Sequence, residues 1–269
     1  MPNAPQDWTA SAVAITPGFE TSGDPFKGVS GDFDGMGISC GALQWNIGLG
    51  SLQPLVRAAG KPVVLAAMPT FGTEMWQACS GSIRDGLAIV RGWQNGTTLK
   101  ALAKSELRTL MGTPEMRTQQ QIRIDAVADT AYRWADRWAN TRNGTQASKR
   151  LFCWFFDVAT QNGDLEGLTP QTVKDFIALN RPDKVDDLIC DFLASRTGTS
   201  GHVRDANKNG ALWRNPAGAE RLEVLCMSYL RSKTSNPRWR HVVLNRKGAI
   251  AIGKGWVNSS LYDFSSHGL

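Results

Sequence analysis

Apolar residues recur every three or four positions over most of the chain beyond residue 97. This is the period of an amphipathic helix that buries one face. With Pro and Gly as start and stop signals, the pattern predicts helices near 99–111, 114–142 and 146–161, from 170 onward, and near 182–193 and 218–232. Residues 196–218 are polar and rich in glycine, so we expect a loop there, and we expect short strands and loops in the tail.

The first hundred residues have a different pattern. A short helix is expected at about 7–16, ended by Pro17 and Gly18. A stretch rich in Gly, Asp and Ser follows, and residues 37–45 then indicate a small hairpin. No Pro/Gly/Ser linker divides the sequence. We therefore expect one mainly α (α+β) domain over residues 1–269, with two lobes and the small sheet at the cleft between them.

Composition narrows the class of protein. The 269 residues are 42% hydrophobic and 20% charged, which excludes a disordered or fibrous chain. No run approaches the roughly 18 apolar residues of a membrane-spanning helix, so no membrane span is expected. The five cysteines lack paired spacing and are expected to be buried thiols. The three histidines are isolated, so neither a metal nor a cofactor is expected.

The net charge of +6 favours anionic polymers as partners. The basic residues are scattered, however, and the sequence has no RNP, zinc-finger or helix-turn-helix signature, so nucleic acid is not expected. The N-terminus has no basic segment ahead of its weakly apolar stretch, so we expect synthesis in the cytoplasm without a signal peptide.

Two carboxylates, Glu20 and Asp34, lie near the expected cleft and are candidate catalytic residues. Glu20 follows Phe19 just after the first helix ends, and an apolar neighbour would raise the pKa of Glu20 toward that of a general acid. Asp34 lies in a hydrated, glycine-rich turn that would keep it ionised. Such a pair suits the cleavage of a glycosidic bond. From the residues alone, a helix-end Glu and a solvated Asp-Gly turn with no catalytic role is the alternative.

The string Asp34-Gly35-Met36-Gly37-Ile38-Ser39 resembles a motif of the lysozyme-like superfamily, and most closely of the family 46 chitosanases: an acid, Gly-x-Gly, an aromatic or aliphatic residue, then a hydroxyl residue. The segment 41–44, Gly-Ala-Leu-Gln, is similar to the Gly-Leu-x-Gln of goose-type lysozymes and lytic transglycosylases, whose Gln lines the sugar cleft. Segments 110–120 and 156–163 match helical parts of the chitosanases more loosely. The resemblance implies a lysozyme-like, bilobal fold.

The resemblance also implies a role for each matching residue. Glu20 would be the general acid, Asp34 the general base and Ser39 the hydroxyl that helps hold the attacking water, with inversion at the anomeric carbon. Ser replaces the more usual Thr there, and Met36 replaces a usually basic residue. Substrate contacts are expected from Asp32, Gln44, Trp45, Asn46 and Gln161. Asp32 is also the fallback second carboxylate, and a lytic transglycosylase, which needs only the Glu, stays an alternative.

The positive charge favours peptidoglycan, whose attached groups are negative, over the polycation chitosan. We therefore expect a muramidase-like glycoside hydrolase acting on peptidoglycan. Hydrolysis of chitosan or chitin oligosaccharides is the second interpretation, and a cell-wall glycan-binding module without turnover is the third. A peptidoglycan substrate implies action at the cell wall or periplasm after signal-independent delivery, as for a phage lysin or a secreted effector. An immunity or delivery protein is then a further expected partner.

Overall fold

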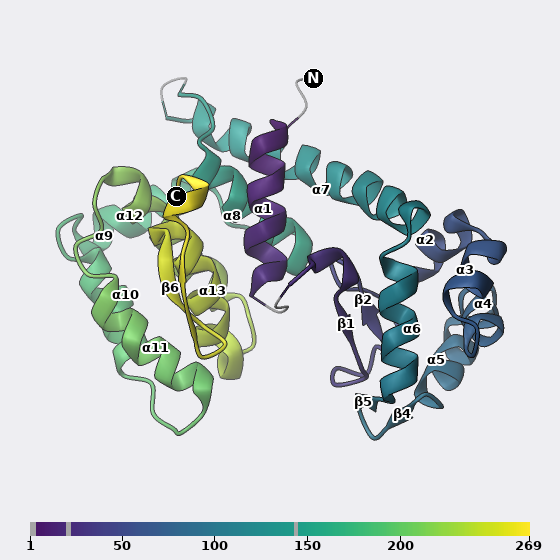
Figure 1. Ribbon diagram of the computed structural model, residues 1–269. Coiled ribbons are helices and arrows are strands. Elements are labelled where there is room, and N and C mark those ends of the chain that lie inside the picture. The colour runs from purple at the N-terminus through teal and green to yellow at the C-terminus, as the bar shows by residue number, and fades with distance from the viewer. Residues whose placement is uncertain (1–3, 20–22, 143–144) are drawn as a thin grey trace. The chain divides into compact units, whose positions relative to one another are not determined.

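The computed structural model describes residues 4–19, 23–142 and 145–269. The chain folds into two compact units, unit 1 being Met1–Glu20 with Val127–Leu269 and unit 2 being Thr21–Ala126. Both are mainly helical and carry small antiparallel sheets, as Figure 1 shows, so the prediction of a mainly α protein is confirmed.

Unit 1 is built from helices and one C-terminal hairpin. Its elements are α1 (Gln6–Gly18), the later part of α7 (Pro114–Asn140), α8 (Lys149–Gln161), α9 (Pro170–Asn180), α10 (Val185–Ala194), α11 (Gly201–Leu212), α12 (Ala219–Lys233), η2 (Pro237–Trp239), α13 (Arg240–Ile252), β6 (Lys254–Val257), β7 (Ser260–Asp263) and η3 (Ser265–His267). Helix α8 is buried from Arg150 to Val158 and packs against α1 and α13. It therefore forms the centre of this unit.

Unit 2 joins a small sheet to short helices. Its elements are η1 (Pro25–Lys27), β1 (Val29–Ser30), β2 (Ser39–Cys40), β3 (Trp45–Asn46), α2 (Leu52–Ala59), α3 (Lys61–Ala67), α4 (Gly72–Ser80), α5 (Ile83–Arg91), β4 (Gln94–Asn95), β5 (Thr98–Leu99), α6 (Ala101–Met111) and the start of α7. The hairpin expected at 37–45 is β2 with β3, and β1 extends it to three antiparallel strands.

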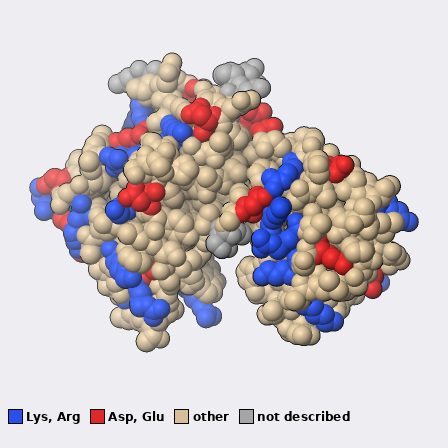
Figure 2. Space-filling view, in the orientation of Figure 1, with Lys and Arg blue, Asp and Glu red and all other residues tan. Residues whose placement is uncertain are grey.

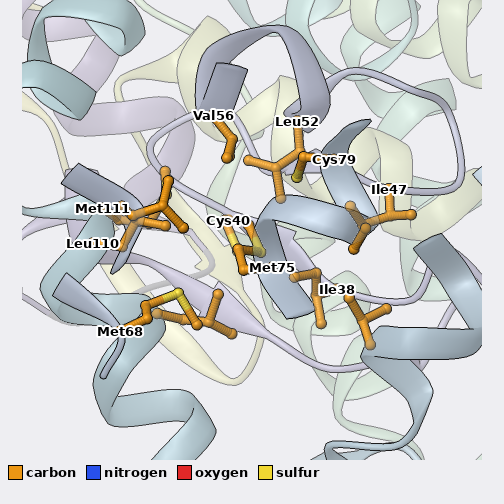
Figure 3. Packing of buried hydrophobic residues seen from close by; sticks show 14 of the residues in the cluster. Ile38, Cys40, Ile47, Leu52, Val56, Met68, Met75, Cys79, Leu110 and Met111 are labelled. Atoms are coloured by element: carbon orange, nitrogen blue, oxygen red, sulfur yellow. The ribbon is translucent and has the colours of Figure 1, made fainter. Parts of the chain in front are cut away.

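The three-stranded sheet has one apolar and one polar face. Val29 pairs with Cys40, and Cys40 pairs with Trp45, so these three side chains share a face. That face packs on the hydrophobic core of unit 2, to which Cys40 and Met111 belong (Figure 3). Ser39 pairs with Ser30 on one side and with Asn46 on the other, so these three side chains lie on the opposite, polar face.

The expected loop at 196–218 is wrong, because most of it is helix α11. Two of its polar residues, Asp205 and Asn209, are buried and bonded to distant backbone. Asn209 Oδ1 accepts from the Trp256 amide at 2.7 Å, and Asp205 Oδ2 accepts from the Ser259 amide at 2.8 Å. These bonds attach α11 to the β6–β7 hairpin, so side chains that are typical of a loop serve here as the buried face of a helix.

Two other parts of the prediction are incomplete. The tail was expected to be strand and loop, but it begins with η2 and α13 before the β6–β7 hairpin. Helices α2 to α5 fill residues 52–91, where no helix was predicted. They are 7 to 9 residues long, a length at which a helix is marginal by itself and depends on packing.

All five cysteines are free and buried, which confirms the prediction of buried thiols. Burial raises the pKa of Cys153 to about 12. Within the described residues, no helix is both long enough and apolar enough to cross a membrane.

Candidate functional site

The C-terminal end of α1 is held by side chains from the last thirty residues of the chain. Three of them donate hydrogen bonds to its final carbonyl oxygens: Arg246 Nη2 to Thr16 at 2.7 Å, Tyr262 OH to Gly18 at 3.1 Å, and Asn258 Nδ2 to Phe19 at 2.7 Å. The Phe19 ring is 2% exposed and packs edge-on against Tyr262. The backbone is thus fixed up to the residue that precedes Glu20.

Behind this point lies a buried ion cluster. Asp157 Oδ1 accepts from Arg246 Nε at 2.7 Å, and Asp157 Oδ2 accepts from Lys247 Nζ at 2.8 Å. Burial would raise the pKa of Asp157, but the charges of Arg246 and Lys247 and their hydrogen bonds outweigh it and hold that pKa below its ordinary value. An aspartate within the apolar stretch 151–158 is costly to bury alone, so the sequence predicts an arginine partner, either Arg221 or Arg246, and the structure shows Arg246. Lys247 is a second partner, and the cluster carries one more positive than negative charge.

A cavity of about 360 Å³ lies beside the end of α1. Among the described residues it is lined by Gln161, Asn162, Val242, Val243, Arg246, Lys247, Val257 and Asn258. Its volume falls in the range of small-molecule sites. Asn162 Oδ1 is buried and has no hydrogen-bond partner among the residues that the structure describes. A buried acceptor without a donor is costly, so this atom favours a ligand that brings an N–H or O–H group.

In unit 2, a tight turn between β1 and β2 carries both predicted aspartates. Asp34 is exposed, and its Oδ1 accepts from the Met36 amide at 3.1 Å. Gly37 follows with φ +84°, and a Cβ there would lie 2.8 Å from a methyl carbon of Leu87. The turn therefore needs glycine at 37, and it presents the Asp34 carboxylate to solvent.

Asp32 has a different environment from Asp34. Its Oδ1 accepts from the Gly37 amide and its Oδ2 from Arg91 Nε, both at 2.7 Å. Burial acts to raise the pKa of Asp32, but the hydrogen bonds from Arg91 and Gly37 and the Arg91 charge together hold it below the ordinary value. With both oxygens engaged, Asp32 fastens the turn rather than presenting a carboxylate to a substrate.

Ser39 is the centre of the polar row on the sheet. It pairs with Ser30 on one side and Asn46 on the other, and it is 3% exposed. Asn46 Oδ1 accepts from the Leu49 amide at 2.8 Å. Gln44 adopts φ +55° and uses both ends of its amide within the sheet, donating to the Gly41 carbonyl at 3.0 Å and accepting from Ser30 Oγ at 3.2 Å. The Gln44 side chain therefore stabilises the hairpin turn.

The structure brings some of the predicted site residues together. Asp32, Asp34, Ser39, Gln44 and Asn46 all lie on the turn and polar row of one sheet in unit 2. Trp45 lies on the opposite, apolar face of that sheet and packs against the core. Gln161 belongs to unit 1, at the end of α8, where it lines the cavity. Glu20 lies outside the described residues.

Sequence reasoning missed the residues that hold the end of α1. Neither Asn258 nor Tyr262 has a local signal, because each acts through a contact more than 200 positions away. Lys247 has no clear local signal either, because the polar residues Asn245 and Arg246 precede it directly and its partner Asp157 lies 90 positions away.

Within the described ranges there is no group of three or more His, Cys, Asp or Glu side chains that could hold a metal ion. Comparison with known proteins gives no match: no family model, no curated protein and no solved structure is similar to this chain.

Proposed function

We propose that the chain is a lysozyme-like glycoside hydrolase that cleaves the glycan strand of bacterial peptidoglycan. In this proposal, Glu20 protonates the glycosidic oxygen as the bond to the anomeric carbon breaks. Asp34 takes a proton from the water that attacks that carbon from the opposite face, and Ser39 helps to hold this water. The products are a free hydroxyl on one side and an inverted reducing end on the other.

The observation that carries the proposal is the anchoring of α1 immediately before Glu20. General acid catalysis requires the donor to be held within hydrogen-bond reach of one substrate atom. Three hydrogen bonds fix the last carbonyls of α1, and a cavity with amide and cationic side chains lies beside them. These bonds hold the residue before Glu20 in place, which is what a positioned proton donor requires.

The second support is the contrast between the two aspartates of the turn. Asp32 has both oxygens bonded and fastens the loop, whereas Asp34 is exposed with one amide contact. A general base needs this second kind of environment, since it must meet water. The order of elements, from a helix through a three-stranded antiparallel sheet to a helical body, is also the one expected of a lysozyme-like fold.

The substrate class follows from charge and from the cavity. A basic protein approaches an anionic wall polymer more readily than a cationic one. The unpartnered acceptor of Asn162 favours a sugar that carries an N–H donor, such as an N-acetylated amino sugar.

The test is digestion of purified peptidoglycan, with the released fragments analysed by mass spectrometry. The wild type should release fragments with new reducing ends. Glu20→Gln and Asp34→Asn should each reduce release by at least about a hundredfold. Glu115→Gln, which removes an exposed carboxylate at the start of α7, is the charge-matched control and should retain activity.

Each other outcome points to a named alternative. Anhydro-sugar ends with an active Asp34→Asn variant would indicate a lytic transglycosylase. Cleavage of chitosan but not peptidoglycan would indicate a chitosanase. If the wild type and Glu20→Gln both release nothing and both sediment with the wall, the chain is a glycan-binding module.

A further inference from the structure

Helix α6 carries a row of basic side chains along its exposed side. Lys100 at its N-terminus, Lys104 and Arg108 are all exposed and four residues apart. At the rise of an α-helix, successive members of such a row are about 6 Å apart along the axis. In Figure 2, a band of Lys and Arg side chains lies over the part of unit 2 that Figure 1 labels β1 and α6, while other basic side chains of this unit lie outside the band.

The row has no carboxylate of its own. The single acidic residue in α6, Glu106, is 6% exposed and faces the other way, where it accepts from the amides of Thr70 and Phe71 at 3.0 to 3.2 Å. Like charges four residues apart on a helix repel each other. Their separation of about 6 Å is shorter than the Debye length in physiological salt, so the repulsion is only partly screened. Helix α6 is therefore destabilised by the row, unless an anion binds there.

Two more cations extend the row beyond the end of α6. The Lys27 side chain crosses Gly112, so closely that a Cβ at 112 would lie 2.5 Å from Lys27 Cε. Arg117 donates to the Gly112 carbonyl at 3.2 Å, pairs with Asp24, and lies over the Phe26 ring at 5.1 Å. We call these five residues together the α6 basic row: Lys100, Lys104, Arg108, Lys27 and Arg117.

We infer that the α6 basic row is a binding surface for a linear, phosphodiester-bearing polymer, and that this polymer belongs to the bacterial cell wall rests on the proposed function. The surface is one side chain wide and extends for about 18 Å from Lys100 to Gly112. It holds five cations and one carboxylate, Asp24, which pairs with Arg117. A flexible chain with one charge per repeat can follow such a row, and each phosphate releases counterions when it binds. This binding is distinct from cleavage, since none of the five residues is in the candidate site.

The side chains around the row favour this polymer over nucleic acid. Binding of single-stranded nucleic acid depends on aromatic rings on which bases stack. Helix α6 contains no aromatic residue, and Arg117 covers the ring of Phe26. Duplex nucleic acid presents two strands of phosphates, whereas this surface is one row wide.

The test measures binding of a synthetic glycerol-phosphate oligomer by the full chain. The variant Lys100→Gln/Lys104→Gln/Arg108→Gln removes the core of the row, and Lys61→Gln/Arg84→Gln/Arg123→Gln removes three exposed cations elsewhere in unit 2. At 50 mM salt, the first variant should bind about ten- to a hundredfold more weakly than the wild type, and the control should bind like the wild type. The slope of log Kd against log salt should fall by about 2 in the first variant alone.

Three results would overturn the inference. Equal binding by the wild type and the first variant would show that the row is not the contact surface. Equal losses in the two variants would show an effect of net charge only. Tighter binding of single-stranded DNA with the same number of phosphates would assign the row to nucleic acid. Failure of peptidoglycan cleavage leaves these outcomes unaffected, so the two proposals fail separately.

Discussion

Lys247 Nζ donates a 2.8 Å hydrogen bond to Asp157 Oδ2, and neither side chain is more than 1% exposed. Arg246 occupies the other oxygen of Asp157 and also reaches the Thr16 carbonyl at the end of α1. One carboxylate thus links α8, α13 and α1. Burial lowers the pKa of Lys247, while the charge of Asp157 raises it, so the lysine depends on this single partner for its charge.

We predict that Asp157→Asn destabilises the protein by about 3–5 kcal/mol, because it leaves two cations in the interior without a counter-charge. Asp175→Asn, at an exposed position on α9, is the control and should change the unfolding free energy by less than about 0.5 kcal/mol. Urea unfolding measures both. A loss below about 1 kcal/mol in Asp157→Asn would mean that water already reaches the cluster.

The two aspartates of the β1–β2 turn should respond differently to mutation. At neutral pH, Asp32→Asn should cost about 1–3 kcal/mol, since it weakens charge-assisted hydrogen bonds, and Asp34→Asn should cost less than about 0.5 kcal/mol. The folded pKa of Asp32 is lowered, so its contribution is full above the unfolded value of about 3.9 and is lost as the pH falls through the folded pKa. The stability difference between wild type and Asp32→Asn should therefore shrink in acid.

Hydrogen exchange gives a local measure of the same effect. The Gly37 amide donates to Asp32 Oδ1, so it should exchange faster in Asp32→Asn and at the wild-type rate in Asp34→Asn. Equal exchange in the two variants would contradict the division of roles within the turn.

Under the proposed function, Tyr262→Phe should lower kcat about tenfold with little change in KM. The substitution keeps the ring against Phe19 and removes only the bond to the Gly18 carbonyl, which positions the residues that follow. The loss of stability should be no more than about 1.5 kcal/mol. Tyr132→Phe, a half-buried tyrosine on α7, is the control, and equal kinetic effects in the two variants would argue against a positioning role for Tyr262.

Gly112→Ala tests the α6 basic row without removing a charge. The added methyl would meet Lys27 Cε, the far end of a flexible side chain, so Lys27 should move at little cost in stability. The φ of −87° at Gly112 suits alanine. Binding of the glycerol-phosphate oligomer should weaken about two- to fivefold, while Thr109→Ala on the same helix should bind as the wild type does. Unchanged binding in Gly112→Ala would exclude Lys27 from the surface.

Local sequence signals were sufficient to predict a helix or hairpin where residues within that element stabilise it. Pro17 and Gly18 mark the end of α1, and Thr169 with Thr172 forms a capping box that starts α9, so the prediction of these two helices is confirmed. The hairpin of β2 and β3 also has its turn signals in sequence, and Gly41 there has φ +77°. The mainly α class follows from such signals together with the helical period of apolar residues.

The sequence by itself thus determined the class of fold, the glycine-rich turn that carries Asp34, and the need for a partner to a buried Asp157, since these depend on neighbours in the chain or on one residue's solvation. Tertiary structure alone decided that α11 is a helix and that Asn258 and Tyr262 hold the end of α1. It also decided that Asp32, and not Asp34, fastens the turn, because Arg91 lies 59 residues away. The physical reason is the same in each case: a hydrogen bond between distant residues forms only once packing has brought them together, so no local pattern records it.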